Sequence, residues 1–81
     1  MRDSTEYLFA PSLHIAERAA RKQGWHPHGR SGWIKPDGNQ VYFIGLPDQL
    51  AAVDKHATIY VVGEVSPVLK RLNRKWAKLR V

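Results

Sequence analysis

The sequence predicts a small α/β (or α+β) domain, in which a sheet of three or four strands carries an N-terminal helix and a basic amphipathic C-terminal helix. Three observations lead to this prediction. Residues 41–44 and 57–62 are rich in β-branched and aromatic side chains, which is typical of strands. Residues 12–23 and 66–79 carry apolar side chains at helical spacing. A chain of 81 residues has the length of a single domain with a small core.

The first elements are a short apolar run and a helix. Residues 7–9 are expected to form a first edge strand, which ends before Pro11. Residues 12–23 are expected to be helical, with Pro11 or Ser12 at the start and Gly24 as the stop. The buried side of this helix is small, so the helix can lie close to a sheet; it consists of Leu13, Ala16, Ala19 and Ala20.

The middle of the chain predicts two strands joined by a tight turn. Residues 25–32 contain two glycines and a proline and follow a third glycine, so they are expected to be a loop. Residues 33–35 and 40–44 follow as strands around Pro36-Asp37-Gly38-Asn39, whose residue types suit a β-turn. The run 41–44 is apolar on both faces, which indicates a central strand.

The second half predicts a short helix, a strand and a final helix. Residues 47–53 are expected to be the short helix and residues 57–62 the strand. About a dozen residues separate the two long strands, which is enough for a crossover between parallel strands, and an antiparallel arrangement stays open. After a turn at 63–65, Ser66 and Pro67 form a helix-start signal. The predicted apolar stripe is Val68, Leu69, Leu72, Trp76 and Leu79.

The whole net charge of +6 is carried by the last seventeen residues. Residues 1–64 contain seven cationic and seven acidic side chains, so the remaining six of the 13 Lys and Arg residues give the excess. These six are Lys70, Arg71, Arg74, Lys75, Lys78 and Arg80, with no acidic residue among them. Such segregation favours a surface for phosphates or for an acidic partner protein over an ordinary solvated helix face.

Composition bounds the compartment and the partners. There is no Cys, which fits a reducing, cytoplasmic location. The polar start does not resemble a signal peptide, and no apolar run approaches the ~20 residues that cross a bilayer, so no membrane association is expected. A core this small favours a homodimer or a bound partner as an additional source of stability.

Metal binding and catalysis have little support in the sequence. His26 and His28 form an H-x-H pair in the glycine-rich loop, but a zinc site needs three or four ligands. No nucleophile elbow or phosphate-binding loop is present, so neither an enzyme activity nor a cofactor is predicted. A small enzyme or metal protein that uses the His26/His28 loop stays as the third hypothesis.

Several aromatic residues are candidates for stacking on the bases of a nucleic acid. Trp25, Trp33, Tyr42 and Tyr60 have the residue type that stacks on bases, with Arg30 and Lys35 near them in sequence. In so small a chain the aromatic residues are also the natural core, above all Trp33 and Tyr60, which fall on predicted strands. Trp25 is the more open case because its loop is irregular.

The order of parts resembles small uncharacterised proteins encoded by tailed bacteriophages. The resemblance rests on an alanine-rich helix followed by Gly24 and Trp25, on residues 46–50 and on residues 57–63. It implies an accessory or host-takeover protein, and it assigns no site residues.

The first hypothesis is therefore a non-enzymatic nucleic-acid-binding module, with either DNA or RNA as the ligand. Its predicted contacts are Lys70, Arg71, Arg74, Lys75, Lys78 and Arg80, together with Arg30 and Trp25. The alternative is an interaction module, or an inhibitor, that docks the same helix on an acidic surface of a host protein. Surface display of Val68 or Trp25 would favour that alternative, because such an interface needs an apolar centre.

Overall fold

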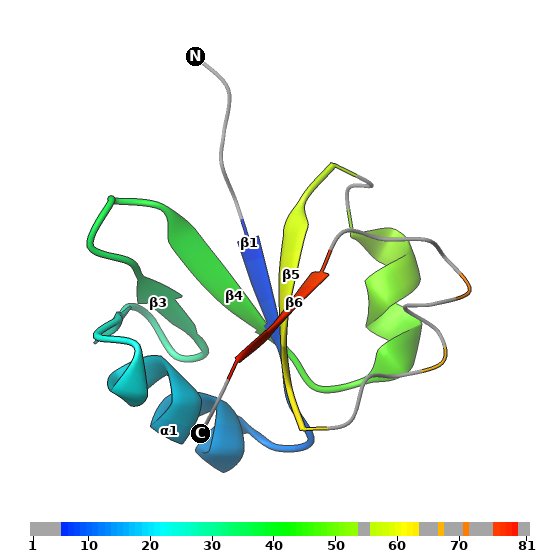
Figure 1. The fold of residues 1–81 in the computed structure, drawn as a ribbon, viewed down its shortest axis with the longest axis horizontal. Coiled ribbons are helices and arrows are strands. Elements are labelled where there is room, and N and C mark those ends of the chain that lie inside the picture. The colour runs from blue at the N-terminus through cyan, green and yellow to red at the C-terminus, as the bar shows by residue number, and fades with distance from the viewer. Residues whose placement is uncertain (1–5, 54–55, 64–66, 68–70, 72–75, 80–81) are drawn as a thin grey trace.

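The structure, a computed structural model, describes residues 6–53, 56–63, 67, 71 and 76–79. These residues form an α+β fold in which one α-helix and one 3₁₀ helix pack on a six-stranded mixed sheet (Figure 1). The elements are β1 (Glu6–Phe9), α1 (Leu13–Lys22), β2 (His26–Pro27), β3 (Gly32–Ile34), β4 (Gln40–Ile44), η1 (Pro47–Ala52), β5 (Thr58–Val62) and β6 (Trp76–Leu79). Neither described helix is long and apolar enough to cross a membrane.

The sheet has the strand order β2-β3-β4-β1-β5-β6. Strands β4, β1, β5 and β6 run parallel, whereas β3 and β2 join as antiparallel strands at one end. The strand predicted at residues 7–9 is present as β1, but its predicted edge position is wrong, since β1 lies between β4 and β5. Leu8 and Phe9 are both buried, one on each face, which requires cover on both sides of the strand.

The sheet has more strands than the three or four predicted. Residues His26 and Pro27, in the expected loop, pair with β3 as the two-residue strand β2. A strand of two residues carries no periodicity that a sequence could show, and Pro27 is tolerated because β2 lies at an edge.

The predicted C-terminal helix is wrong for its last residues. Trp76–Leu79 form β6, parallel to β5, and the described elements include no C-terminal helix. Trp76 and Leu79 are three residues apart, a spacing that fits a helical stripe, but the open edge of β5 binds this segment as a strand instead. That pairing is a long-range contact, which local spacing does not reveal. Residues 64–66, 68–70, 72–75 and 80–81 lie outside the described residues.

Helix α1 confirms the prediction for residues 12–23. The Ser12 side chain caps the first turn by accepting a hydrogen bond from the Ile15 backbone N–H at 3.3 Å. At the other end, Gly24 adopts a positive φ of 82°, the conformation for which glycine is suited at a helix stop. The Trp25 N–H then donates a hydrogen bond to the Ala20 carbonyl, so the chain turns directly into β2.

The turn between β3 and β4 and the crossover between β4 and β5 also follow the predictions. Gly38 has a positive φ, and Lys35 and Asn39 close the turn through a backbone hydrogen bond of 2.9 Å. The short helix at 47–53 is present as the 3₁₀ helix η1. Strands β4 and β5 run in the same direction, one of the two arrangements that the sequence leaves open, and they are not neighbours because β1 pairs with both.

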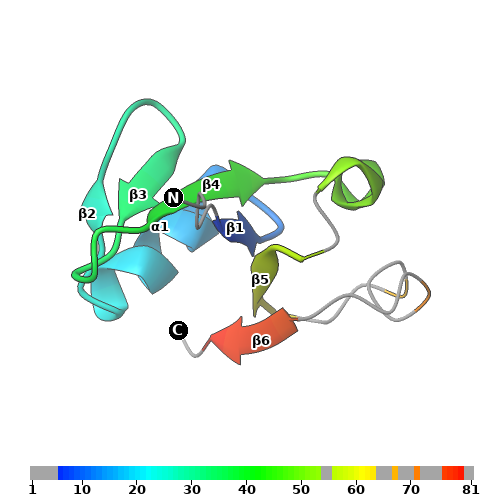
Figure 2. The same ribbon diagram turned by 90° about the horizontal axis from the view of Figure 1, so that it is seen from above.

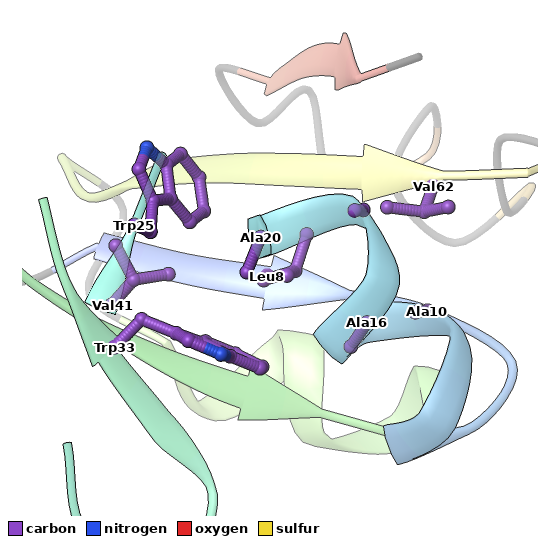
Figure 3. Packing of buried hydrophobic residues seen from close by; sticks show 9 residues of the cluster. Leu8, Ala10, Ala16, Ala20, Trp25, Trp33, Val41 and Val62 are labelled. Atoms are coloured by element: carbon purple, nitrogen blue, oxygen red, sulfur yellow. The ribbon is translucent and has the colours of Figure 1, made fainter. Parts of the chain in front are cut away.

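The two helices cover opposite faces of the sheet (Figure 2). The face under α1 holds the first core cluster, in which Trp33, Leu8 and Val41 lie beneath the alanines of the helix (Figure 3). The other face holds the second cluster under η1: Phe9, Ile44, Leu50, Val53, Ile59 and Val61.

Candidate nucleic-acid interface

The strand register places three aromatic side chains in one row across the sheet. Tyr7 of β1 is in register with Tyr42 of β4 and with Ile59 of β5, and Ile59 is in register with Trp76 of β6. Residues in register point to the same face of a sheet, here the face that carries η1. Tyr42, Tyr7 and Trp76, with Ile59 between the last two, are called the aromatic row below.

The aromatic row is accessible to solvent at both ends. Tyr42 is 44% exposed and Trp76 is 37% exposed, whereas Ile59 is completely buried between the strands that carry Tyr7 and Trp76. The rings of Tyr7 and Tyr42 lie 6.2 Å apart, tilted by 40°. The Tyr42 hydroxyl donates a 2.7 Å hydrogen bond to Gln40 Oε1, which limits the freedom of the ring.

Helix η1 covers the next row of the same face, and Ile59 of the aromatic row belongs to the same buried cluster, whereas Tyr42 and Trp76 stay exposed. That next row consists of Ile44, Phe9, Val61 and Lys78, related by the same registers. Leu50 of η1 packs on its three apolar members and is completely buried. On the β3 side, Gly32 is in register with Tyr42 and has no side chain to cover the ring.

One cationic side chain lies on the face of the aromatic row, and a second precedes the other end of the row along the chain. Lys78 is exposed and lies on the same face as Trp76, two residues further along β6. Arg30 is exposed and lies two residues before Gly32, the neighbour of Tyr42. No acidic residue occurs among the described strand residues that point to this face, which are His26, Gly32, Ile34, Gln40, Tyr42, Ile44, Tyr7, Phe9, Ile59, Val61, Trp76 and Lys78.

The predicted contacts are only partly placed by the structure. Arg71 and Lys78 are exposed, and Lys78 belongs to β6 rather than to a helix. The remaining cationic contacts of the tail lie outside the described residues: Lys70, Arg74, Lys75 and Arg80.

Trp25 is in the core. The residue is 9% exposed and belongs to the buried cluster of Figure 3. Its ring meets the ring of Tyr60 edge-on, with 5.0 Å between the ring centroids. Trp33 is also buried, on the face under α1. Of the four aromatic residues considered for base stacking, Tyr42 is therefore the one with a largely accessible ring.

Lys35 is held inside the protein by a polar cluster. Its Nζ lies 2.7 Å from Glu6 Oε1, and it donates a 3.1 Å hydrogen bond to the Tyr60 hydroxyl. Both charged side chains are only 13% exposed. Glu6 Oε1 accepts no well-aligned hydrogen bond from the described residues, so the ion pair with Lys35 is what compensates its burial. Lys35 therefore links β1, β5 and the β3–β4 turn, and it is not presented to a ligand.

The cluster shifts the pKa values of Lys35, Tyr60 and Asp37. Burial alone would lower the pKa of Lys35, but the contacts with Glu6 and Tyr60 outweigh it and raise the pKa above its ordinary value. Burial, followed by the nearby Glu6, raises the pKa of Tyr60. The backbone N–H of Asn39, which donates to Asp37 at 2.9 Å, lowers the pKa of Asp37, and Lys35 adds to this effect. These shifts belong to a structural ion pair, because the groups neutralise one another.

The histidine pair has no further metal ligands in the described part of the chain. His26 and His28 are both exposed, and the described residues contain no group of three or more His, Asp or Glu side chains arranged to hold a metal ion.

Sequence reasoning does not find two members of the aromatic row. Tyr7 belongs to an apolar run whose faces the pattern leaves unassigned, and the helical spacing places Trp76 on a buried stripe. The alternation of Tyr7 with Phe9 and of Tyr42 with Ile44 is a signal of a common face, but only the register shows that these faces meet.

The chain matches no protein-family model, no curated protein and no solved structure.

Proposed function

We propose that this protein is a non-enzymatic nucleic-acid-binding module. The observation that supports the proposal most directly is a sheet face whose exposed aromatic rings are flanked by cations and whose described strand residues include no acid. Aromatic rings and cations together are the two components with which proteins bind unpaired bases and phosphates. The net charge of +6 adds a long-range attraction for a polyanion.

The binding would be driven mainly by phosphate contacts. Each Lys or Arg that neutralises a phosphate releases a counterion, so affinity falls steeply with salt. Arg71, Lys78 and Arg30 are the described residues in this role, and the other cations of the tail extend the same charge. No base-edge reading motif is present, so we expect little sequence specificity.

The test is fluorescence anisotropy with labelled single- and double-stranded oligonucleotides of DNA and RNA. We expect binding that weakens by orders of magnitude between about 50 mM and 200 mM salt. The double variant Arg71→Glu/Lys78→Glu should bind more weakly and have a smaller salt dependence, because the slope falls by about one unit for each phosphate that is no longer neutralised.

A matched control is available on the opposite face. Arg18 and Lys22 are exposed on α1, and the variant Arg18→Glu/Lys22→Glu changes the net charge by the same amount. If both double variants lose affinity equally, net charge alone is responsible and the proposed surface is wrong. If the unaltered protein binds none of the oligonucleotides at low salt, the function itself is wrong.

A second candidate is an interaction module that docks on an acidic host protein. Leu46 is 63% exposed just after β4, two residues beyond Ile44 of the second core cluster, and offers an exposed apolar side chain away from the aromatic row. Trp25, the residue whose display would favour this candidate, is buried, and Val68 lies outside the described residues. A pull-down from a nuclease-treated lysate tests this candidate; recovery that disappears after nuclease treatment would assign the partner to nucleic acid instead.

A further inference from the structure

We infer that the aromatic row is a stacking platform for a single strand of nucleic acid, with unpaired bases on Tyr42, Tyr7 and Trp76 and the phosphates beside Lys78. This inference rests on the proposed function and specifies its ligand: an unpaired strand rather than a duplex. It also assigns the contact to the sheet face rather than to a basic helix.

The spacing of the row suits a short strand. Adjacent strands of a sheet are about 4.8 Å apart, so three spacings separate β4 from β6 by roughly 14 Å. At about 3.4 Å per stacked nucleotide, this is the length of roughly four nucleotides. Ile59, which is completely buried, separates Tyr7 from Trp76 in the row, so the accessible rings of the platform lie toward its two ends.

The geometry discriminates against a duplex. In a duplex the faces of the bases are already stacked on one another, so a flat ring on a sheet reaches a base face only when the base is unpaired. Successive strands also rotate by about 20–25°, so the three rings do not form one flat stack. The rings of Tyr7 and Tyr42 are already tilted by 40°. A flexible single strand follows this twist, and a stiff duplex does not.

Charge identifies the occupant. The described strand residues of this face include Lys78 and no acidic residue, and Arg30 precedes the β3 neighbour of Tyr42. A second copy of this chain would bring the same positive charge to the interface, which opposes its docking here. A polyanion with flat apolar faces satisfies both the cations and the rings.

Two pairs of variants separate a stacked ring from a merely apolar contact. Tyr42→Leu and Trp76→Leu remove the ring but keep apolar bulk, whereas Tyr42→Phe and Trp76→Phe keep a ring. We expect each leucine variant to bind a single strand about 5- to 150-fold more weakly, which corresponds to the loss of one base–aromatic stack. We expect the phenylalanine variants and Leu46→Ala, which lies off the row, to bind as the unaltered protein does.

Tryptophan emission supplies an independent readout. Trp25 and Trp33 are buried, so Trp76 is the exposed tryptophan and the one that a stacked base would quench. A single-stranded oligonucleotide should quench the emission of the unaltered protein, and Trp76→Phe should abolish this quenching while binding by anisotropy persists. Parallel titrations with single-stranded DNA and RNA of equal sequence show which sugar is preferred, and quenching by either supports the inference.

The contrary outcomes are distinct. If the leucine variants bind normally while Arg71→Glu/Lys78→Glu weakens binding, the platform is wrong and the nucleic-acid function remains. Equal affinity and equal quenching by a duplex of the same length would also overturn the platform. Quenching of the tryptophan emission by polyglutamate would show that the aromatic row binds an acidic protein. A change in emission with protein concentration alone would show that it binds a second copy of this chain. No binding to any oligonucleotide removes both proposals.

Discussion

Lys35 joins three separate segments of the chain. It contacts Glu6 at the start of β1, Tyr60 in β5 and Asp37 in the turn, and Asn39 of the same turn donates to Glu6 at 3.3 Å. The ammonium group also lies 5.4 Å from the centre of the Tyr60 ring. A charged group so enclosed stabilises the fold only while its partners are present, because each partner would otherwise be buried without compensation.

Replacing Lys35 by Met is expected to lower the free energy of unfolding by about 1–3 kcal/mol, because Glu6 loses its counterion and Tyr60 its donor. Urea denaturation measures the change. The double variant Lys35→Met/Glu6→Gln should recover part of the loss, since it no longer buries an unpaired charge. Lys22→Met, an exposed lysine on α1, should change the free energy of unfolding by less than about 0.5 kcal/mol. Equal effects at Lys35 and Lys22 would contradict a structural role for the cluster.

The same cluster predicts a loss of stability in alkali. The pKa of Lys35 is raised in the folded state, so its contribution is complete below the ordinary lysine value of about 10.4 and declines as the pH rises above it. The raised pKa of Tyr60 also lowers the stability as the pH rises, because near its ordinary pKa this hydroxyl ionises more readily in the unfolded chain than in the folded protein. Urea midpoints should therefore fall above about pH 10. They should fall less in Lys35→Met and in Tyr60→Phe; a decline as steep in both variants would show that other groups cause it.

At the scale of elements, the two helices stabilise the sheet in different ways. Helix α1 approaches the sheet closely because three of its core residues are alanines, Ala16, Ala19 and Ala20. The 3₁₀ helix η1 is a single short element, and it inserts one large side chain, Leu50, among the apolar residues of the opposite face. The second core cluster therefore depends on Leu50 more than the first depends on any one residue of α1.

Leu50→Ala is expected to lower the free energy of unfolding by about 2–5 kcal/mol, because it leaves a cavity at a completely buried position. Leu46→Ala makes the same chemical change four residues earlier at an exposed position and should cost less than about 0.5 kcal/mol. Thermal denaturation of the two variants provides the comparison. Similar losses in both would show that η1 does not pack as described.

For the whole molecule, the sheet is asymmetric about β1. One end is the short antiparallel segment β3 and β2, where Pro27 limits further pairing. The other end is closed by β6, whose Leu79 packs against the α1 cluster beside Val62. Strand β6 thus has two roles, because it completes the core and presents Trp76 and Lys78.

A chain that ends at residue 75 should lose this closure. We expect a free-energy loss of about 2 kcal/mol, which lowers the melting temperature by roughly 8–16 °C for a domain of this size. The exposed edge of β5 should also promote association at higher concentration, which analytical ultracentrifugation detects. A chain that ends at residue 79 retains β6 and is the control. If the two chains melt together, β6 does not contribute to the fold.

Two of the tryptophans show most directly what sequence patterns can and cannot predict. Trp25, in a loop rich in glycine, is left open and included among the predicted contacts, and Trp76 is placed on an apolar stripe that can be buried. The structure has Trp25 against Tyr60 in the core and Trp76 exposed on an edge strand. Burial depends on where a segment lies in the sheet, and no short window of the sequence contains that information.

Local patterns in the chain were sufficient to define helix α1 with its Ser12 cap and Gly24 stop, the turn at 35–39, strands β4 and β5, and the short helix before β5. These depend on caps, turn conformations and side-chain alternation, which act over a few neighbouring residues. The folded arrangement alone established that β1 is central, that Trp76–Leu79 pair with β5, and that Tyr7, Tyr42 and Trp76 share one row. Strand order and register are set by hydrogen bonds between distant segments that compete for the same edges, so they become fixed only when the whole chain is folded.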